Sequence, residues 1–509
     1  MLTTAYTAAL FGIDGYLVTV ECNAYSEIPS FEIVGLPDMA VKEAKQRVQA
    51  AASNSGFMLP EMAVTVNLAP ADIKKEGSAF DLAIIAALLR LSSQIPADAD
   101  LESSCFIGEL SFSGAVRSVR GVLPMVLAAR SAGKRDIFVP NKNSAEAAVV
   151  DGVRVFGVES VSDMVAHFRG ERRLSPCARN LDDFNRSIPS DIDFSDVKGQ
   201  ERAKRAMEIA AAGGHNILLI GPPGSGKSML AKRLPTILPP MTFEEALVTT
   251  KVHSVSGLLS DGQSLVCRRP FRSPHHTLSA PSLVGGGKNP TPGEISIANN
   301  GVLFLDELPE FPKNVTESLR QPLEDGKVTV TRTAGRVTFP SNFMLVCAMN
   351  PCKCGYFGSK TKVCTCKKED IKKYLSKISG PLLDRIDIQV ELPALDYGEL
   401  SRKEAAEPSS AVRERVVKAR EIAQKRFENT SVTCNAGMQS SLIRVHCALD
   451  SAGDTVLKRA FDQMGMSARG YDRILRVART IADLDGSEKI EVKHVAEAVQ
   501  LRSLDRKYW

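Results

Sequence analysis

A glycine-rich loop between two apolar segments constrains this chain more than any other part of its sequence. Residues 217–220 are Ile, Leu, Leu and Ile, a run that predicts a buried strand. Residues 221–228 then read Gly-Pro-Pro-Gly-Ser-Gly-Lys-Ser, and residues 229–234 predict a helix. The complete pattern G-x-x-x-x-G-K-[ST] between a strand and a helix is typical of a phosphate-binding loop.

In such a loop the glycines allow backbone N–H groups to point at phosphate oxygens, and the helix N-terminus adds positive potential. We expect Lys227 to neutralise the β- and γ-phosphates and Ser228 to hold Mg²⁺, so the predicted ligand is ATP with magnesium. An ordinary glycine-rich turn is the alternative. The predicted nucleotide-binding residues are Gly221, Pro222, Pro223, Gly224, Ser225, Gly226, Lys227, Ser228 and Met229.

Length and composition set the broad class of the protein. A chain of 509 residues exceeds one hydrophobic core and predicts about three domains. The net charge of +5 permits a nucleic-acid partner without requiring one, so any basic surface must be local. We expect no membrane partner and no signal peptide, because no apolar run is long enough and the N-terminus lacks basic residues. The cytoplasm is the expected compartment.

The predicted fold class is α/β, with a phosphate-loop core between an N-terminal α/β domain and a C-terminal helical lid. Within the N-terminal domain we expect a helix capped by Asp38 and a hairpin at 105–119. Strands are expected at 31–34, 63–68 and 136–139, and helices at 80–91 and 121–132. The expected boundaries are 1–168 for the first domain, 169–195 and 396–408 for linkers, 196–395 for the core and 409–509 for the lid.

Polar side chains follow two further apolar runs. Asp306 and Glu307 come directly after residues 301–305, and Asn350 follows residues 342–349. At the carboxyl ends of parallel strands, we expect Asp306 to bind Mg²⁺, Glu307 to polarise the attacking water and Asn350 to orient it. Two carboxylates on an ordinary loop are the alternative.

The eleven cysteines cluster once, at Cys352, Cys354, Cys364 and Cys366. Four thiolates in a short loop suit a tetrahedral structural Zn²⁺ site, although the C-x-C spacing is tighter than the usual C-x₂-C. Free buried thiols and a redox pair are the alternatives. Residues 352–377 also hold eight lysines against two acidic residues, a composition that favours a polyanion or a solvated face.

Residues 327–339 alternate like a basic hairpin that turns at Ala334 and Gly335. Its basic side chains include Lys327, Arg332 and Arg336. A purely solvated hairpin is the alternative to a binding role.

These motifs together resemble the YifB/ComM family of magnesium-chelatase-like AAA+ ATPases. The segments L-R-Q-P-L-E-D-G at 319–326 and S-A-R-G-Y-D-R-I-L-R-V-A-R-T-I-A at 467–482 make the resemblance specific, and it covers essentially the whole chain. It implies a homohexameric ring with ATP between subunits, in which Arg385 reaches the neighbour's γ-phosphate. It also implies that Arg469, or alternatively Arg473, contacts the nucleotide of its own subunit.

The N-terminal domain is similar to the Lon-protease domain. The alignment puts Ala79, or Ser78 after a one-residue slip, at the position of the nucleophilic serine, and residues 120–125 contain no lysine. A Ser–Lys pair needs the lysine as its base, so we expect this domain to be non-catalytic and an ATP-dependent protease to be excluded.

The resemblance implies a motor that acts on DNA. Members of the family resemble DNA motors of branch migration in natural transformation, whereas the chelatase relatives use ATP to insert Mg²⁺ into a porphyrin. The segment between the phosphate loop and Asp306 is longer than a minimal core requires and includes residues 268–276 and 285–288. In AAA+ helicases, hairpins in this insertion and at the position of 327–339 line the central pore, so Lys327, Arg332 and Arg336 are expected to contact phosphates of single-stranded or branched DNA. The alternative is a chelatase-like ATPase that remodels a protein or metal-insertion partner.

Overall fold

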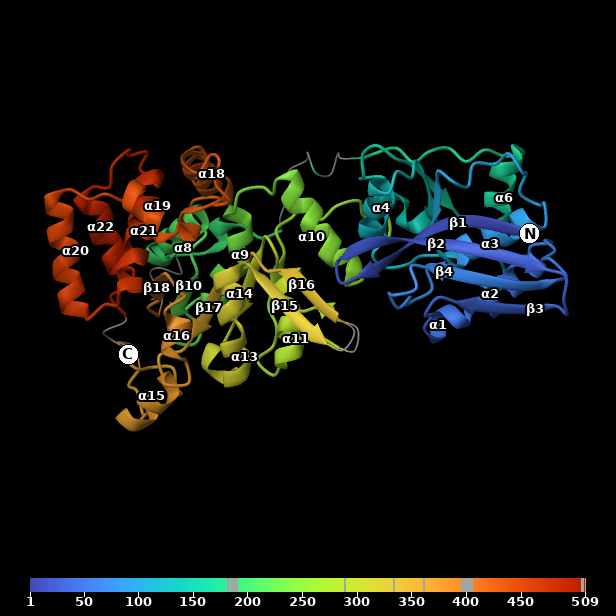
Figure 1. Cartoon of the computed structure of the whole chain (residues 1–509). Helices are drawn as coiled ribbons and strands as arrows, with labels where there is room; N and C mark the ends of the chain where they lie inside the picture. Colours follow the sequence, from blue (N-terminus) through green and yellow to red (C-terminus); the bar gives the residue numbers. More distant parts are fainter. Residues whose placement is uncertain are drawn as a thin grey trace. The chain divides into compact units, whose positions relative to one another are not determined.

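The computed structural model divides the chain into two compact units (Figure 1). One comprises Met1–Ile188 with Thr242–Cys267, and the other Pro189–Met241 with Arg268–Trp509. Residues 242–267, which the sequence pattern placed in the 196–395 core, therefore pack with the first unit. The structure describes residues 1–180, 184, 191–287, 290–332, 335–359, 362–394, 406–504 and 508.

The first unit is built on a mixed four-stranded sheet in the order β1-β2-β4-β3. Strands β1 and β2 pair antiparallel over their full lengths, whereas β3 runs parallel to β4. The two longest strands were not predicted. β1 contains three Ala residues, a type depleted in strands, whereas β2 was missed although its buried Val18, Val20 and Cys22 alternate with Thr19 and Glu21. The bounds are β1 Leu2–Phe11, β2 Asp14–Tyr25, β3 Ser30–Val34 and β4 Ala63–Ala69.

Helix α3 fills the space between this sheet and a small parallel sheet of order β5-β8-β9. Every residue from Asp81 to Leu89 is buried, as the apolar composition of the segment requires. Asp38 caps α1 by accepting from the Val41 N–H at 2.8 Å, which confirms its predicted role. The remaining bounds are α1 Met39–Lys42, α2 Ala44–Asn54, α3 Asp81–Leu91, β5 Ser104–Phe106, β6 Glu109–Leu110, β7 Val116–Arg117, α4 Val122–Ser131, β8 Asp136–Pro140, α5 Ser144–Ala147, β9 Arg154–Val158 and α6 Val161–Arg169.

Helix α10 (Phe243–Val255) belongs to this unit because it packs on α4. The Gly121 N–H donates to the Ser254 carbonyl at 3.2 Å, and the Ser254 hydroxyl donates to the buried Glu146 carboxylate. Burial raises the pKa of Glu146, and its three hydrogen bonds lower it only in part. A polar contact thus secures the 242–267 segment against the first unit.

The second unit contains, among the described residues, a five-stranded parallel sheet of order β11-β14-β17-β10-β18. The strands are β10 Ile217–Ile220, β11 Phe271–Arg272, β14 Val302–Leu305, β17 Met344–Met349 and β18 Ile388–Glu391. The central strands are buried along their whole length, which explains their continuous apolar runs. This sheet confirms the predicted α/β phosphate-loop core.

Helices α8, α9, α18 and α21 complete the core of the second unit, in one hydrophobic cluster with the sheet. The predicted C-terminal helical region is confirmed. Its bounds, with the two core helices, are α8 Glu201–Gly213, α9 Lys227–Ile237, α18 Ser409–Arg426, α19 Ser440–His446, α20 Ser451–Met464, α21 Ala468–Leu484 and α22 Val492–Gln500.

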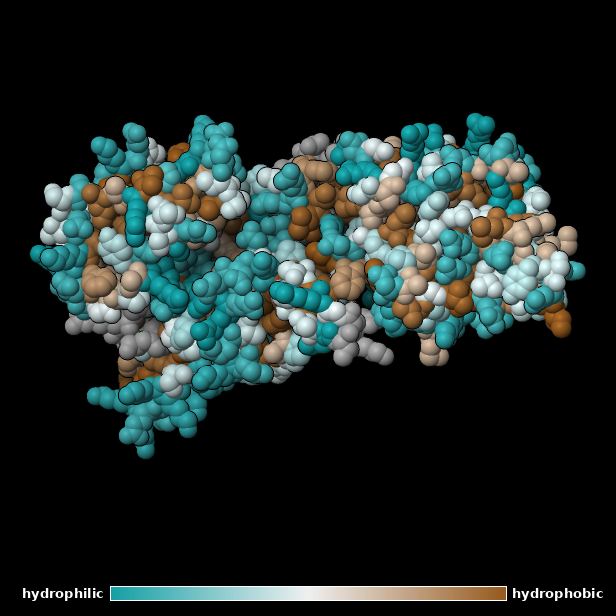
Figure 2. All heavy atoms as spheres, viewed as in Figure 1, coloured by the Kyte–Doolittle hydropathy of each residue, from teal (hydrophilic) through white to brown (hydrophobic). Residues whose placement is uncertain are grey.

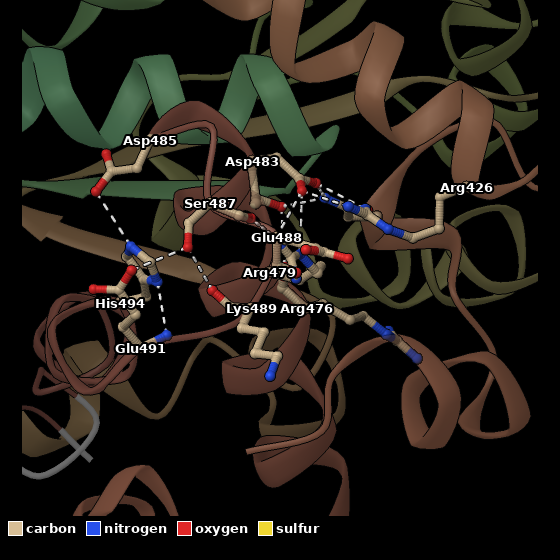
Figure 3. A network of polar contacts seen from close by, with 12 residues as sticks. Arg426, Arg476, Arg479, Asp483, Asp485, Ser487, Glu488, Lys489, Glu491 and His494 are labelled. Atoms are coloured by element: carbon tan, nitrogen blue, oxygen red, sulfur yellow. Dashed lines mark hydrogen bonds and ion pairs between the residues drawn. The ribbon is translucent and has the colours of Figure 1, made fainter. Parts of the chain in front are cut away.

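A buried charge network joins the helices of the lid (Figure 3). Asp483 on α21 accepts hydrogen bonds from Arg426 on α18 and from Arg479 one turn earlier. Asn435 donates to the same carboxylate at 2.8 Å. Because Asp483 is almost fully buried, these donors compensate its desolvation and fix α18 against α21.

Several short elements project from the sheet of the second unit. The expected hairpin at 327–339 is present as β15 and β16, with Val328 opposite Phe339 on its buried face. Its predicted turn residue Ala334 lies outside the described residues. The bounds are α11 Ala280–Val284, β12 Gly285–Gly286, β13 Thr291–Pro292, α12 Glu294–Ile297, α13 Lys313–Ser318, α14 Arg320–Asp325, β15 Lys327–Arg332, β16 Gly335–Pro340, α15 Lys368–Leu375 and α16 Gly380–Leu383.

None of the helices in the described parts of the chain combines the length and apolar content that a membrane crossing requires.

Candidate nucleotide site

The phosphate-binding loop lies at the carboxyl edge of the parallel sheet. Strand β10 leads into Gly221, and its neighbour β17 leads into Asn350, so the two strand ends meet. The Lys227 ammonium donates to the carbonyls of Gly221 and Pro222 at 2.8 and 2.9 Å, and to Asn350 Oδ1 at 3.1 Å. The structure therefore brings the predicted phosphate-binding lysine and the predicted water-orienting asparagine into direct contact.

The two residues expected to hold magnesium also meet. Ser228 is the second residue of α9, and Asp306 directly follows β14. The Ser228 hydroxyl donates to Asp306 Oδ2 at 2.6 Å. A hydroxyl and a carboxylate at this separation suit Mg²⁺, which takes oxygen ligands and keeps several waters.

Burial lowers the pKa of Lys227, while the charges of Asp306 and Glu307 raise it. The carbonyls that accept from Lys227 are weak substitutes for a phosphate, so the site holds a partly desolvated cation beside the glycine-rich loop. A bound polyphosphate would favour the charged form of this lysine. The arrangement is that of an anion site.

Glycine is required at the first position of the loop. A β-carbon on Gly221 would lie 2.5 Å from the Leu392 carbonyl oxygen. Gln200, which the sequence did not single out, anchors the loop by donating to the Ser225 and Pro393 carbonyls at 3.2 and 2.8 Å. Only the folded chain reveals this role, because Gln200 and Pro393 are far apart in sequence.

Glu307 occupies the position expected for the residue that polarises water. Its backbone is left-handed, with φ of 53°, and its side chain is 58% exposed. The Glu307 N–H donates to Asp306 Oδ1 at 3.0 Å. Its carboxylate lies near the imidazole of His276, whose Nδ1 is 3.9 Å from Glu307 Oε2. Sequence reasoning noted the segment that contains His276 but gave this residue no role.

Arg385 lies at the opposite, amino edge of the same sheet. Its backbone carbonyl accepts from Asn216, which directly precedes β10. Its guanidinium donates to the carbonyls of Arg320 and Pro381 at 3.1 and 2.8 Å and pairs with Glu324. Strand β10 therefore separates Arg385 from the phosphate loop of its own chain.

A cavity of about 550 Å³ opens at this amino edge. Arg385, Arg469, Arg473 and Arg476 all line it, together with Glu324, Asp384, Asp387 and Asp472, so its wall carries charges of both signs. The structure thus brings Arg469 together with Arg385, and within the described chain no hydrogen bond or ion pair joins Arg469 to the phosphate loop.

Arg469 and Arg473 differ in their surroundings. Arg473 is 6% exposed and lies between Asp384 and Asp387, at 3.6 and 3.7 Å. Burial lowers the pKa of Arg473 to about 10, against the opposing charge of Asp387. Arg469 is exposed at the start of α21. Of the two, Arg469 is the one available to a ligand that enters the cavity.

The four clustered cysteines lie within reach of one metal ion. All four sulfurs lie within 4.8 Å of one another, and the closest pairs, among Cys352, Cys354 and Cys364, are separated by 3.4 to 3.7 Å. Tetrahedral Zn²⁺ with Zn–S bonds of about 2.3 Å requires sulfur separations of about 3.8 Å. The residues present therefore fit zinc, with Cys366 as the fourth ligand.

The cysteine loop packs directly on the phosphate loop. A β-carbon on Gly355 would lie 2.5 Å from Pro223 Cδ, so only glycine fits there. Beyond the loop, α15 presents exposed Lys368, Lys372 and Lys373, and Figure 2 shows hydrophilic side chains over the protrusion that α15 forms. The predicted basic stretch is thus a solvated surface that begins beside the nucleotide site.

The three basic residues of the β15–β16 hairpin are all exposed. Lys327 and Arg336 share the face opposite the buried Val328, because Thr331 pairs with Arg336. Arg332 is the last residue of β15 and lies on the same face as Val328. A β-carbon on Gly286 of β12 would lie 3.5 Å from Arg332 Nη2. The two inserted hairpins therefore meet at Arg332.

The Lon-like region of the first unit has no paired nucleophile and base. The Ser78 hydroxyl donates to the Glu109 carboxylate, and Ala79 is buried. Val122 and Leu123 lie in residues 120–125, the segment that aligns with the catalytic lysine of Lon proteases. Lys75 is fully buried and donates to the Ile73 carbonyl at 2.7 Å. Among the described residues, no hydrogen bond joins Ser78 to a lysine.

Three family models match the chain and together cover most of it. Residues 193–400 match the magnesium chelatase subunit ChlI, residues 20–143 match subunit ChlI of Mg-chelatase, and residues 406–502 match the ChlI C-terminal model. The competence protein ComM of Haemophilus influenzae is 42% identical over 512 residues, which is 99% of this chain and 98% of ComM. The chain belongs to the YifB/ComM family of magnesium-chelatase-like AAA+ ATPases.

Other members and a more distant relative agree with this assignment. The YifB protein of Escherichia coli is 41% identical over 506 residues, covering 99% of this chain and 98% of YifB. A Lon protease of Mycolicibacterium smegmatis is 25% identical over 170 residues, which is 31% of this chain and 21% of the protease. The predicted family and its weak similarity to Lon are therefore confirmed, and the family implies ATP hydrolysis with Mg²⁺.

The nucleotide site predicts opposite effects for two substitutions. Lys227→Ala should abolish tight ATP binding, because it removes the cation that faces the phosphates. Glu307→Gln should bind ATP with near wild-type affinity but lower kcat by about 10²-fold or more, since loss of a general base typically costs 10²–10⁴-fold. Nucleotide binding and steady-state ATPase assays distinguish the two. Turnover of Glu307→Gln at the wild-type rate would mean that another group polarises the water.

The cysteine geometry predicts about one Zn²⁺ per chain in protein purified without chelator. Replacing Cys352 and Cys364 with serine should remove the metal, because it leaves only two thiolate ligands. Elemental analysis gives the content, and Cys177→Ser with Cys267→Ser serves as a control that alters two cysteines outside the cluster. Zinc-free wild-type protein would rule out the site.

Proposed function

We propose that this protein is an ATP-driven ring motor that acts on single-stranded or branched DNA, as a helicase or branch-migration enzyme in recombination or natural transformation. The observation that carries the DNA half of the proposal is the exposed basic hairpin β15–β16 in the same unit as the nucleotide site. The relative from Haemophilus influenzae is named a competence protein, which supports the same setting.

In this proposal each residue of the nucleotide site has one task. The phosphate loop and Lys227 bind ATP, and Ser228 and Asp306 would hold Mg²⁺. Glu307 takes a proton from the attacking water, and Asn350, already in contact with Lys227, orients that water beside the γ-phosphate. When bound, Mg²⁺ would offset charge on the phosphates.

A ring accounts for the position of Arg385. The phosphate loop follows β10, whereas Arg385 contacts Asn216 in front of β10. In a closed head-to-tail ring the carboxyl edge of one subunit faces the amino edge of the next, so Arg385 would reach the neighbour's γ-phosphate. An arginine supplied in this way stabilises the charge of the transition state. We propose a homohexamer.

We assign Arg469 to that same neighbouring site. It lines the cavity that Arg385 lines, at the edge of the sheet away from its own phosphate loop. The resemblance had suggested a contact with the nucleotide of its own subunit, but the shared cavity favours joint action with Arg385. Arg473 is held between Asp384 and Asp387 and forms part of the wall of this cavity.

The alternative function is a chelatase-like ATPase that remodels a protein or metal-insertion partner. The family models are named for a magnesium chelatase subunit, which favours it. The two functions are distinguished by the molecule that stimulates the ATPase. An ATPase that is indifferent to all DNA but responds to protoporphyrin would support the alternative.

The trans role of Arg385 predicts complementation between two inactive variants. Arg385→Ala should bind ATP but barely hydrolyse it, and Lys227→Ala should not bind it. In an equal mixture, about a quarter of the interfaces of a random ring would combine an intact phosphate loop with an intact Arg385, so ATPase should return to roughly that share. The measurement is the ATPase rate of mixtures across the whole range of ratios.

The control for complementation mixes Arg385→Ala with Lys227→Ala/Arg385→Ala, in which no interface contains an intact arginine. This mixture should stay inactive. Equal activity in the two mixtures, or none in either, would exclude a role of Arg385 across the interface.

The basic hairpin predicts a loss of DNA coupling. Replacing Lys327, Arg332 and Arg336 together with alanine should spare basal ATPase but remove its stimulation by DNA. The slope of log affinity for single-stranded DNA against log salt should become shallower by about 2, since each phosphate contact contributes about 0.7. Salt titrations and unwinding of a branched substrate provide the measurement.

A matched control replaces Arg444, Lys458 and Arg459 together with alanine. This variant loses the same number of positive charges, but from exposed positions of the lid. It should behave like wild type. Full DNA binding and wild-type unwinding by the hairpin variant would contradict the proposed DNA motor.

A further inference from the structure

The positive charge of this chain is concentrated in the cysteine loop and in helix α15, which follows it. Residues 352–377 hold eight lysines against two acidic residues, an excess of six positive charges, whereas the net charge of the whole chain is +5. The remaining residues together therefore carry no net positive charge. A partner of opposite charge is best sought at this stretch.

One face of α15 is packed on the protein, which fixes the position of the helix. Ile371, Tyr374 and Leu375 are buried. The cysteine loop adjoins the other end, because Cys366 directly precedes Lys367, the N-cap residue of α15. A helix of eight residues is marginal in isolation, so these contacts determine where it lies.

The lysines on the opposite face of α15 lack acidic partners. Lys368, Lys372 and Lys373 are exposed, and within the described parts of the chain no ion pair joins them to a carboxylate. Glu369 lies four residues before Lys373, a spacing that favours an ion pair, but none is present between them. These three ammonium groups are therefore available to a ligand.

The start of α15 is arranged against helix stability. Lys367 and Lys368 lie at the helix N-terminus, where a cation is unfavourable because the helix dipole is positive there. On α18, by contrast, Lys418 pairs with Glu414 at 2.8 Å one turn away. A local arrangement that weakens a helix is typical of functional positions.

The composition of the exposed face favours duplex DNA as its partner. The apolar residues of α15 are buried, so the face lacks the apolar or aromatic anchor on which protein interfaces depend. Sites for single-stranded DNA add aromatic side chains on which bases stack, but Tyr374 is only 4% exposed. Duplex DNA offers a row of phosphates, which lysines bind by neutralising charge and releasing counterions.

This face lies apart from the β15–β16 hairpin. The hairpin ends at Pro340, shortly before β17 begins, whereas α15 follows the opposite end of β17 through the cysteine loop. Figure 1 shows the two elements in different parts of the second unit. A DNA strand at the hairpin would therefore leave α15 free for another part of the same substrate.

We propose that the lysines of α15 bind the phosphate backbone of a duplex arm of branched DNA, while the hairpin contacts the strand inside the ring. This inference rests on the proposed DNA motor and adds a second contact to it. A single strand engages the hairpin alone, whereas a branched substrate engages both surfaces. The α15 face thus gives the motor its preference for branched DNA.

The test replaces Lys368, Lys372 and Lys373 together with alanine, which preserves the helix because alanine is the best helix former. It compares binding of a single strand with binding of a fork in which that strand continues into a duplex arm. The variant should bind the fork roughly tenfold more weakly than wild type, and its affinity for the single strand should stay within about twofold. Wild-type affinity for the fork would overturn the proposal.

Salt dependence gives a second measure of the same contact. The slope of log affinity for the fork against log salt should become shallower by about 2.7 in the alanine variant, since each phosphate contact on duplex DNA contributes about 0.9. An unchanged slope would mean that these lysines neutralise no phosphates, which also overturns the proposal.

A charge-preserving variant separates electrostatics from packing. Replacing the same three lysines with arginine keeps every positive charge, so binding of the fork should stay within about twofold of wild type. A loss equal to that of the alanine variant would show that the helix serves packing and not phosphate binding, and the proposal would fail.

Chemical modification locates the contact without any substitution. Acetylation followed by mass spectrometry should show that the fork protects Lys368, Lys372 and Lys373. Lys458, which is exposed on the lid, should react at the same rate with and without DNA. Undiminished reaction of the α15 lysines in saturating fork DNA would contradict the proposed contact.

The size of the assembly tests the competing partner, a second copy of this chain. With ATP, the alanine variant should form the same oligomer as wild type, as measured by light scattering. Failure of this variant to assemble would show that α15 lies between subunits and would overturn the proposal.

Failure of the proposed function is recognised separately. If wild-type protein neither binds DNA nor responds to it, the DNA motor is rejected, and this inference with it. If the hairpin variant loses DNA stimulation as expected but the α15 variant binds the fork like wild type, the motor stands and only the role of α15 is rejected.

Discussion

The contact of Lys227 with the ends of two neighbouring parallel strands is the interaction on which the candidate site depends. Its ammonium reaches the carbonyls that follow β10 and the amide that follows β17, and this is possible only because the two strands are adjacent and parallel. The next strand, β14, adds Asp306, which accepts from Ser228 on the same helix as Lys227. One sheet edge thus gathers an ammonium, a hydroxyl, a carboxylate and an amide from segments more than 120 residues apart. Parallel strands explain this gathering, because all their carboxyl ends lie on one side.

The two edges of the sheet carry different side chains. The carboxyl edge holds the phosphate loop with Asp306 and Glu307, while the amino edge opens into a cavity lined by four arginines and four acidic residues. Burial lowers the pKa of Arg473 even with Asp387 beside it. The arginines of this cavity wall lie away from the phosphate loop of their own chain. The lid contributes to that wall because the buried carboxylate of Asp483 ties α21 to α18.

Insertions around the sheet surround the nucleotide site with elements that a minimal phosphate-loop protein lacks. The cysteine loop rests on Pro223 through Gly355, the loop after β11 brings His276 to Glu307, and the hairpins meet where Gly286 faces Arg332. Packed contacts of this kind transmit displacement from one element to the next.

Sequence by itself determined the fold class and predicted the candidate nucleotide site. The residues from Gly221 to Ser228 stand in a fixed pattern, and the apolar runs before Asp306 and Asn350 have the continuous character that only strands buried on both faces require. The cysteine cluster was equally visible, since its four ligands lie within one short loop. Local patterns of this kind can be recognised from the sequence because each residue's role depends on its neighbours in the chain. Only the tertiary structure decided the rest. Strand β1 escaped notice because its alanines carry little strand signal, and Gln200, His276 and the shared cavity of Arg385 and Arg469 involve partners distant in sequence. The packing of residues 242–267 with the first unit was hidden for the same reason: it depends on Ser254 meeting Glu146, and nothing in the order of residues brings those two together.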